Sequence, residues 1–147
     1  MIFIGADHRG YNLKEALKIY MKELNYEFED LGSLEIKFDD DYPDYAILVA
    51  QKVSQNPKEN RGILICGSGI GVDITANKFK DVRSALCFDE GQARASRNDD
   101  NANVLSLASD FTDEDKAKEI VKVWLETPHA RLEKYERRLT KIKEIEK

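Results

Sequence analysis

Short apolar runs alternate with amphipathic segments along this chain, and this alternation limits the folds available to it more than any other feature. The apolar runs have the length of strands and lie at residues 2–4, 28–31, 62–66, 84–88 and 103–107. Several are apolar throughout, which is typical of strands that helices cover on both faces. Regular alternation of strand and helix favours a parallel, doubly wound sheet. We therefore predict an α/β chain with a Rossmann-like, three-layer αβα fold built on a five-stranded parallel sheet.

Amphipathic helices are predicted between these runs. They cover residues 12–24, 43–56, a short stretch after the glycine-rich turn that follows Cys66, 90–98 and 112–124. Asn12 and Glu15 have the spacing of a capping box at the start of the first helix. Pro43 suits the first turn of the second helix. No linker or internal repeat interrupts the pattern, so residues 1–147 are expected to form a single domain.

Composition excludes several classes of protein. The 147 residues carry 28 acidic and 23 basic side chains, and this net charge of −5 argues against a nucleic-acid partner, which would need a basic face. No apolar run approaches the roughly 20 residues of a membrane helix. Cys66 and Cys87 are too few for a disulfide framework, and the chain opens without a leader-like segment. We expect a soluble cytoplasmic protein with no membrane partner.

The C-terminal segment, about residues 131–147, differs from the rest of the chain. It carries a narrow apolar stripe on an otherwise charged helix, formed by Leu132, Tyr135, Leu139, Ile142 and Ile145. One interpretation is that the stripe packs on its own domain. We favour packing on a second subunit, because a terminal helix so polar on its other faces offers a single interface. The prediction is a protruding helix used in a homodimer, which can assemble further into a tetramer.

Open parallel sheets bind ligands beyond the carboxyl ends of their strands. Polar groups and glycines follow three of the predicted strands, at residues 5–10, 66–71 and 89–91. The stretch 66–71 is the most informative, because its glycines leave backbone N–H groups unobstructed ahead of a helix, an arrangement that favours an anion. It matches neither the dinucleotide fingerprint nor the Walker pattern. A tight strand-to-helix turn is the alternative interpretation.

Cys66 ends its predicted strand beside these N–H groups. A thiol has an ordinary pKa of about 8.5, and a helix N-terminus lowers the pKa of a thiol. Cys66 is therefore a candidate base or nucleophile, with a small buried core residue as the alternative. Cys87 lies inside a predicted strand and is interpreted as a core residue.

Six segments together resemble the ribose-5-phosphate isomerase B family, which also contains the galactose-6-phosphate isomerase subunits. The matching segments are 5–10 (GADHRG), 41–46 (DYPDYA), 62–71 (GILICGSGIG), 76–78 (ANK), 96–97 (SR) and 103–105 (NVL). The resemblance covers almost the whole chain. It implies an aldose–ketose isomerase of phosphorylated sugars that works through a cis-enediolate, without a metal or an organic cofactor.

The resemblance also implies roles for particular residues. Cys66 falls on the base that moves a proton between C1 and C2 of the sugar. Asp7 and His8 match a substrate-binding pair. The segment that receives the developing enediolate oxygen corresponds to Gly67, Ser68 with its hydroxyl, Gly69, Ile70 and Gly71. Donors aimed at developing charge are usually the largest catalytic contribution, in agreement with the anion site inferred from the glycines.

Three positions depart from the family pattern. Asp99 stands where the family has a histidine that opens the sugar ring, and Asp100 stands where an asparagine is common. Asp110 replaces a frequent arginine after the fifth strand. The phosphate-binding basic residues of the family correspond to Lys134 and Arg138. Arg131 and Arg137 are alternatives for that role, and a solvated helix face is the non-functional interpretation of all four.

Ring opening is the step that these departures affect most. An ordinary aspartate ionises near pH 3.9 and is a poor proton donor at neutral pH. Either a carboxylate such as Asp99 opens the ring, or another group such as His8 does, or the substrate is not ribose 5-phosphate.

The favoured reaction is ribose 5-phosphate to ribulose 5-phosphate. The alternatives are another pentose phosphate or a hexose 6-phosphate, or a sugar-phosphate sensor without catalysis. A sensor would need the glycine loop but not the Cys66 thiol.

Overall fold

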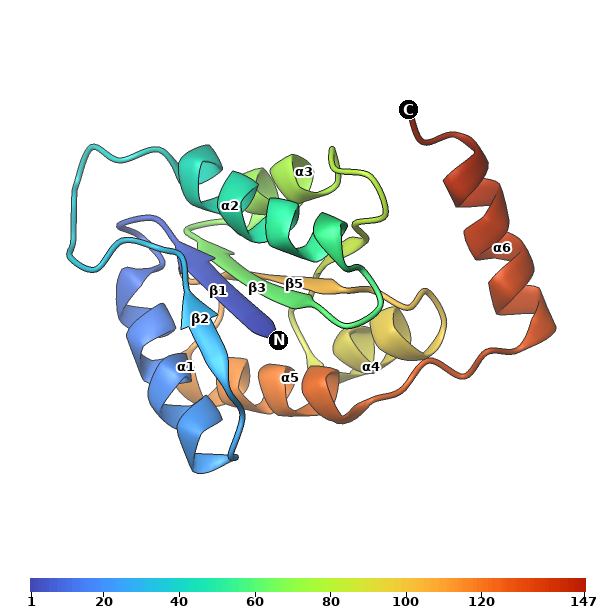
Figure 1. The fold of residues 1–147 in the computed structure, drawn as a ribbon. Coiled ribbons are helices and arrows are strands. Elements are labelled where there is room, and N and C mark those ends of the chain that lie inside the picture. Colours follow the sequence, from blue (N-terminus) through green and yellow to red (C-terminus); the bar gives the residue numbers. More distant parts are fainter.

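A single parallel sheet forms the centre of the computed structural model, which describes residues 1–147 (Figure 1). Its strands are β1 (Ile2–Ala6), β2 (Phe28–Asp30), β3 (Arg61–Cys66), β4 (Ser84–Leu86) and β5 (Val104–Ala108). Their order in the five-stranded sheet is β2-β1-β3-β5-β4, and every neighbouring pair is parallel. The predicted sheet is confirmed in strand number and direction.

Helices cover both faces of this sheet (Figure 1). They are α1 (Tyr11–Glu23), α2 (Tyr42–Gln55), α3 (Ile70–Ala76), α4 (Glu90–Asn98), α5 (Glu114–Glu126) and α6 (Glu133–Glu144). Helices α1, α4 and α5 share one hydrophobic core with the sheet, whereas α2 and α3 share a second core on the other face. The three-layer αβα prediction is therefore confirmed. None of the helices combines the length and hydrophobicity needed to cross a bilayer.

Strand β3 shows why its sequence is apolar throughout. Ile63 and Ile65 belong to the core beneath α1 and α5, and Leu64 and Cys66 belong to the core beneath α2 and α3. Successive strand residues point to opposite faces, so a strand covered on both sides needs apolar side chains at every position. Burying each large aliphatic side chain contributes about 1.5–3 kcal/mol.

The predicted capping box at Asn12 and Glu15 is wrong. Helix α1 begins at Tyr11 after the N-cap Gly10, and no side chain caps it there. The Asp7 carboxylate accepts the N–H groups of Arg9 and Gly10, both at 3.1 Å, and this turn brings the chain into helical geometry before Asn12. Two other helices start with a side-chain cap, since Asp89 and Asp113 accept N–H bonds at the starts of α4 and α5.

Helix α6 stands away from the rest of the chain (Figure 1). It has no buried residue, and its apolar stripe remains largely exposed, with Ile145 at 78%. Its ties to the domain are polar, and they include the ion pair between Lys143 and Asp81 at 2.8 Å. The interpretation in which the stripe packs on its own domain is therefore wrong.

Candidate active site

The carboxyl edge of the sheet brings three chain segments together. Strand register places Ala6 beside Ile65 and Cys66 beside Ala108, so the loops after β1, β3 and β5 are neighbours. A hollow of about 310 Å³ opens here. It is lined by Asp7, Arg9, Tyr42, Cys66, Gly67, Ser68, Ile70, Gly71 and Ile74. Most of these residues belong to the predicted site, and they meet because parallel strands end at one edge.

The loop from Gly67 to Gly69 carries unpaired backbone donors; Gly67 and Ser68 line this hollow, whereas Gly69 is buried behind it. The N–H groups of Gly67, Ser68 and Gly69 donate to no protein acceptor, and the N–H of Ile70 bonds to Ser68 Oγ at 3.3 Å. Gly69 has φ of +72°, a left-handed conformation that favours glycine. A Cβ atom there would also lie 2.5 Å from the Leu86 side chain. The loop is thus suited to stabilise an oxyanion.

The two cysteines occupy different environments. Cys66 ends β3 and lines the hollow, although only 4% of it is exposed. Cys87 is buried under α4 outside the hollow, and burial raises the pKa of its thiol to about 11. Such a thiol stays protonated at neutral pH and is inert. The interpretation of Cys87 as a core residue is confirmed, and it lies just beyond β4 rather than inside it.

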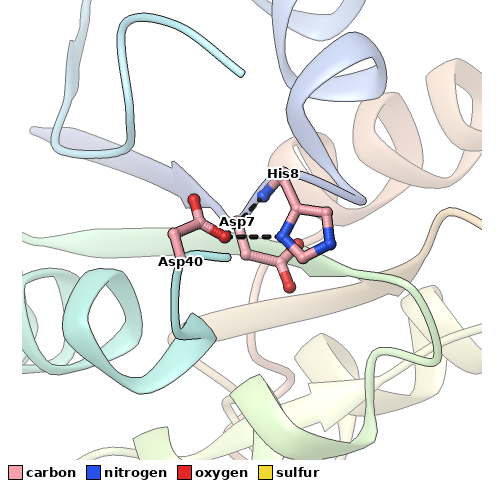
Figure 2. A group of neighbouring side chains, drawn as sticks. All are labelled: Asp7, His8 and Asp40. Atoms are coloured by element: carbon pink, nitrogen blue, oxygen red, sulfur yellow. Dashed lines mark hydrogen bonds and ion pairs between the residues drawn. The ribbon is translucent and has the colours of Figure 1, made fainter. Parts of the chain in front are cut away.

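His8 is held by an acidic residue that the sequence does not single out. The Nδ1 atom of His8 lies 2.6 Å from Asp40 Oδ1, and the backbone N–H of His8 donates to the same oxygen at 3.1 Å (Figure 2). Tyr45 donates its hydroxyl to Asp40 Oδ2 at 3.0 Å. Burial raises the pKa of Asp40, but the bonds from His8 and Tyr45 outweigh burial and leave that pKa below its ordinary value.

Arg9 brings a positive charge into the hollow, and it is a second residue that the sequence does not single out. Its guanidinium lies directly over Gly67, where a Cβ atom would be 2.1 Å from Arg9 Cζ. Arg9 forms an ion pair with Asp110, and about half of its side chain is exposed. Asp110 stands where the family often has an arginine after β5. In this chain the nearby cation is Arg9, which comes from the loop after β1.

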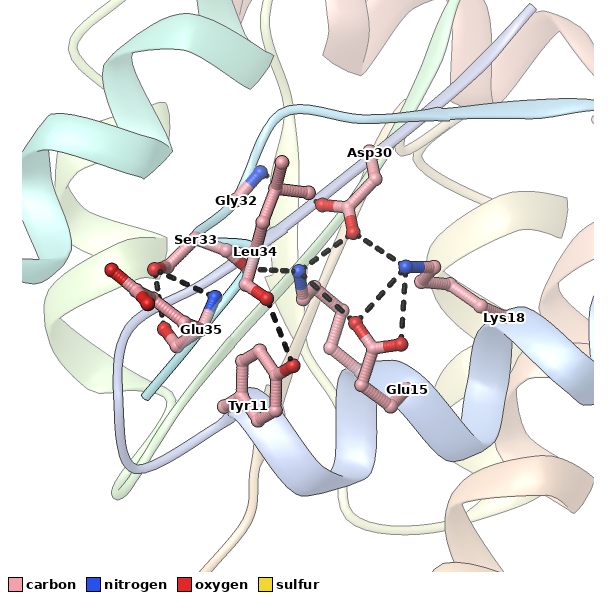
Figure 3. Close-up of polar contacts among 9 residues, drawn as sticks. Tyr11, Glu15, Lys18, Asp30, Gly32, Ser33, Leu34 and Glu35 are labelled. Carbon is pink, nitrogen blue, oxygen red and sulfur yellow. Dashed lines mark hydrogen bonds and ion pairs between the residues drawn. The ribbon is translucent and has the colours of Figure 1, made fainter. Parts of the chain in front are cut away.

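The loop that carries Asp40 is anchored to α1 by a buried ion pair. Lys14, with no exposed side-chain surface, donates to Asp30 Oδ2 at 2.7 Å and to the Ser33 carbonyl at 2.6 Å. Lys18 adds a second bond to Asp30 at 2.8 Å (Figure 3). Burial raises the pKa of Asp30, but the bonds from both lysines and from the Gly32 N–H overcome it and lower that pKa. This network holds the chain in place just after β2, where the loop that leads to Asp40 begins.

One cluster has side chains close enough to hold a metal ion. The ligand atoms of Asp7, His8 and Asp40 all lie within 4.8 Å of one another. However, His8 Nδ1 is already bonded to Asp40, and Asp7 Oδ1 already accepts two backbone N–H groups. The three side chains therefore already form a hydrogen-bonded network, in which Asp40 holds His8 and Asp7 holds the start of α1.

The family model of Ribose/Galactose Isomerase matches residues 2–142. The chain belongs to this family. A probable ribose-5-phosphate isomerase B from Mycoplasma genitalium is 43% identical over 148 residues, which cover 99% of this chain and 95% of that protein. The ribose-5-phosphate isomerase B of Mycobacterium tuberculosis is 32% identical over 146 residues, with 99% and 90% covered.

Solved structures of the Ribose/Galactose Isomerase family share this fold. The ribose-5-phosphate isomerase B of Mycoplasma genitalium, crystallised with bound ribulose-5-phosphate, has a TM-score of 0.94 and 41% identity, covering 97% of this chain and 93% of that one. The Clostridium thermocellum ribose-5-phosphate isomerase B has a TM-score of 0.93 and 39% identity, covering 99% and 96%. The resemblance inferred from the sequence motifs is confirmed.

Four predicted site residues of this isomerase lie away from Cys66. Asp99 and Asp100 follow α4, which starts at the carboxyl edge of the sheet and ends at the amino edge, ahead of β5. Asp99 accepts a bond from the Asn98 side chain at 2.7 Å, and it makes no pair with Arg97. Lys134 and Arg138 lie on α6, also beyond the amino edge. One chain therefore does not bring these residues into the hollow.

A larger hollow of about 1060 Å³ separates α6 from the amino edge. Arg61, Arg83 and Arg97 line it, together with Arg131 and His129. None of the first three arginines forms an ion pair with a carboxylate; each instead donates to backbone carbonyls. The chain thus presents two separate concave regions, one at each edge of the sheet.

Proposed function

We propose that this chain interconverts ribose 5-phosphate and ribulose 5-phosphate. The observation that carries the proposal is the Cys66 thiol in the hollow, beside the unpaired N–H groups of Gly67, Ser68 and Gly69. Binding alone would require the donors but not the thiol. Relatives at up to 43% identity are named as isomerases of this sugar, which supports the same choice of substrate.

Cys66 acts as the base in this proposal. The thiolate removes the C2 proton of the open-chain aldose, and the C1 oxygen takes up the negative charge of a cis-enediolate. Return of the same proton to C1, together with transfer of the O2 hydroxyl proton to O1, gives the ketose, so no electrons are gained or lost overall. General-base catalysis of this kind contributes about 10²–10⁴-fold to a rate.

The Gly67–Gly71 loop stabilises the enediolate oxygen in the proposed reaction. Preorganised N–H donors act without reorganisation when charge develops. The Ser68 hydroxyl hydrogen has no protein acceptor and is free to bond a sugar oxygen. Asp7 lines the same hollow, and its Oδ2 atom is free to accept a sugar hydroxyl, since Oδ1 holds the loop.

A second subunit completes the site in our proposal. Exposed apolar side chains occur both on α6 and beside the hollow, where Ile70 and Ile74 are 53% and 56% exposed. Docking α6 of one copy near the Cys66 hollow of another buries both groups. The same movement delivers Lys134 and Arg138 to the phosphate, and Asp99 and Asp100 to the sugar hydroxyls.

Lys134 and Arg138 are the favoured phosphate ligands. They are four residues apart on α6, hence on one face of the helix, and neither forms an ion pair within the chain. Arg137 is already engaged with Glu133 at 3.0 Å. Arg131 lines the larger hollow beneath α6. A free pair of cations on one helix face suits a phosphate dianion.

The substrate is tested with a panel of pentose and hexose phosphates, scored by aldose–ketose conversion and loss of the C2 hydrogen to solvent. We expect ribose 5-phosphate to have the highest kcat/KM. A hexose 6-phosphate remains the second candidate, because Asp99 and Asp100 alter the part of the family pattern that contacts the sugar. Turnover of a hexose 6-phosphate without turnover of ribose 5-phosphate would contradict the proposal.

We also propose the cytoplasm as the compartment. Both cysteines are free thiols, and such thiols persist in a reducing environment.

A further inference from the structure

We propose that Asp40 is a positioning residue that holds His8 as the group which opens the sugar ring. This inference rests on the proposed isomerase function and adds a step to it. Ribose 5-phosphate exists mainly as a closed ring, whereas the proton transfer at Cys66 needs the open aldehyde. Some group must therefore move a proton from the anomeric hydroxyl to the ring oxygen.

The hydrogen bonds around Asp40 determine the tautomer of His8. Because its pKa lies below the ordinary value, the Asp40 carboxylate is ionised at neutral pH and can only accept hydrogen bonds. The bond of 2.6 Å from His8 Nδ1 to Asp40 Oδ1 therefore requires the hydrogen on Nδ1. In the neutral imidazole, Nε2 then carries the free lone pair, and it has no protein partner.

His8 lies beside the Cys66 hollow, although it is not among the residues that line it. Its chain neighbours Asp7 and Arg9 both line the Cys66 hollow, and the Asp7 carboxylate lies within 4.8 Å of the His8–Asp40 pair (Figure 2). About a quarter of the His8 side chain is exposed, and Nε2 has no protein partner. The Phe38 ring, 6.3 Å from the imidazole, is 82% exposed and supplies an apolar surface beside it.

Asp40 is itself held from several sides. Tyr45 at the start of α2 donates to its second oxygen, and the His8 backbone N–H donates to the first. At the other end of the loop, the buried Lys14 donates to Asp30 and to the Ser33 carbonyl. A carboxylate with both oxygens engaged has little freedom to move, so the imidazole that it binds is fixed in orientation as well.

The ring-opening step balances with His8 alone as the proton carrier. Nε2 takes the proton of the anomeric hydroxyl, the C1–ring oxygen bond breaks, and the C1=O1 double bond forms. The imidazolium then returns its proton from Nε2 to the departing ring oxygen. Asp40 stabilises the transient imidazolium across Nδ1 and does not itself take a proton. No oxidant, reductant or cofactor enters the step.

A pair of assays separates ring opening from the chemistry at Cys66. Conversion of ribose 5-phosphate requires both steps. Exchange of the C1 hydrogen of ribulose 5-phosphate with deuterated water requires only the Cys66 step, because this ketose has no free hydroxyl able to close a five-membered ring. For Asp40→Asn and Asp40→Ala, we expect kcat on ribose 5-phosphate to fall at least about tenfold, and about 10²-fold or more for His8→Gln. The exchange rate should stay within about twofold of wild type, as expected when general acid–base catalysis is lost in one step only.

Controls and a spectroscopic readout complete the test. Asp39→Asn, on the exposed neighbour of Asp40, should leave both rates unchanged, and Cys66→Ala should abolish the exchange. The ¹⁵N shifts of the His8 ring should report a single tautomer with hydrogen on Nδ1 in the wild type and a tautomer mixture in Asp40→Ala. Asp40→Glu should recover part of the lost kcat.

Three results would overturn the inference while leaving the isomerase function intact. One is an equal loss of conversion and exchange in the Asp40 variants, which would indicate a general structural role. Another is unchanged conversion with Asp40→Asn. The third is a conversion-specific loss in Asp99→Asn but not in Asp40→Asn. By contrast, absence of both activities in the wild-type protein would contradict the proposed function itself.

Discussion

At the scale of single residues, the glycines of the Cys66 loop differ in what they tolerate. Gly69 takes up a left-handed turn against Leu86 and the Leu107 backbone, which leaves no room for a side chain. Gly67 lies under the guanidinium of Arg9, which is half exposed and can shift. Cys66 is nearly buried at the strand end that precedes both glycines.

Replacing the thiol tests the base. In Cys66→Ala we expect kcat to fall by at least about 10²–10⁴-fold, because alanine fills the strand end but carries no proton acceptor. Binding of ribulose 5-phosphate, measured by calorimetry, should be nearly unchanged. Cys87→Ala is the matched control and should retain activity, since its buried thiol stays protonated. Near-normal turnover in Cys66→Ala would remove the thiol from the mechanism.

Replacing the guanidinium tests the cation in the hollow. We expect Arg9→Ala to lower kcat/KM by about 10- to 100-fold, the equivalent of the 1.5–3 kcal/mol of a charge-assisted hydrogen bond. Arg9→Lys should restore part of this loss, because it keeps the charge but not the fork of donors. Arg94→Ala, on the exposed face of α4, serves as the control. An Arg9→Ala enzyme with wild-type kcat/KM would show that Arg9 only pairs with Asp110.

At the scale of elements, α1 and the segment after β2 act as one unit. Lys14 and Asp30 join them through a pair that is almost fully removed from solvent. A buried pair is costly to break, since the remaining charge has no partner. This link determines how the chain leaves β2 and travels to Asp40, so the stability of the unit and the geometry of the site are connected.

The Lys14–Asp30 link predicts a pH-dependent stability. We expect Asp30→Asn to lower the free energy of unfolding by about 3 kcal/mol at pH 7, measured by urea unfolding at fixed protein concentration. The folded state lowers the pKa of Asp30 below 3.8, so this stabilisation is complete above the unfolded value and is lost as the pH falls through the folded one. The difference between wild type and Asp30→Asn should therefore shrink below about pH 4.

An exposed neighbour provides the control for that measurement. Glu29→Gln should change the free energy of unfolding by less than about 0.5 kcal/mol at either pH. A difference between wild type and Asp30→Asn that stays constant from pH 7 to pH 3 would contradict the role of the charged pair.

At the scale of the whole molecule, the predicted site residues lie at two opposite edges of the sheet. The Cys66 hollow lies at the carboxyl edge of the sheet, whereas Asp99 and α6 lie at the amino edge. A two-fold symmetric dimer repeats both halves and can join each hollow to the opposite edge of its partner. In the proposed dimer, the exposed stripe on α6 is the apolar surface that the partner would cover.

Mixing two defective variants tests the shared site. Cys66→Ala and the double variant Lys134→Ala/Arg138→Ala should each be strongly impaired as homodimers. Co-expression should restore about a quarter of wild-type activity, since about half of the dimers are hybrids and each hybrid holds one intact site of two.

The matched control combines Cys66→Ala with Ser68→Ala, which lie in the same half of the site. Every site in that hybrid carries a defect, so activity should not recover. Recovery that is equal in the two mixtures, or sedimentation of the intact protein as a monomer at micromolar concentration, would contradict the dimer.

Local patterns in the sequence determine most of the fold and the centre of the site. The apolar runs of β1, β3 and β5 specify strands because these three are covered on both faces, and Pro43, Asp89 and Asp113 mark helix starts through chemistry confined to a few neighbouring residues. The Cys66 loop is equally local, since strand, glycines and thiol are consecutive. The start of α1 could not be read in this way, because Asp7 caps the chain there before the helix begins.

Contacts between distant residues were decided only by the tertiary structure. Asp40 meets His8 across 32 positions of sequence, and Arg9 meets Asp110 across the gap between β1 and β5. Sequence spacing carries no information on such pairs, because they depend on which strands become neighbours in the sheet. The same holds for Asp99, since the direction of α4 carries it away from the edge where Cys66 lies. Parallel strands joined by returning helices place successive loops at opposite edges, and this topology determines which predicted residues can share a site within one chain.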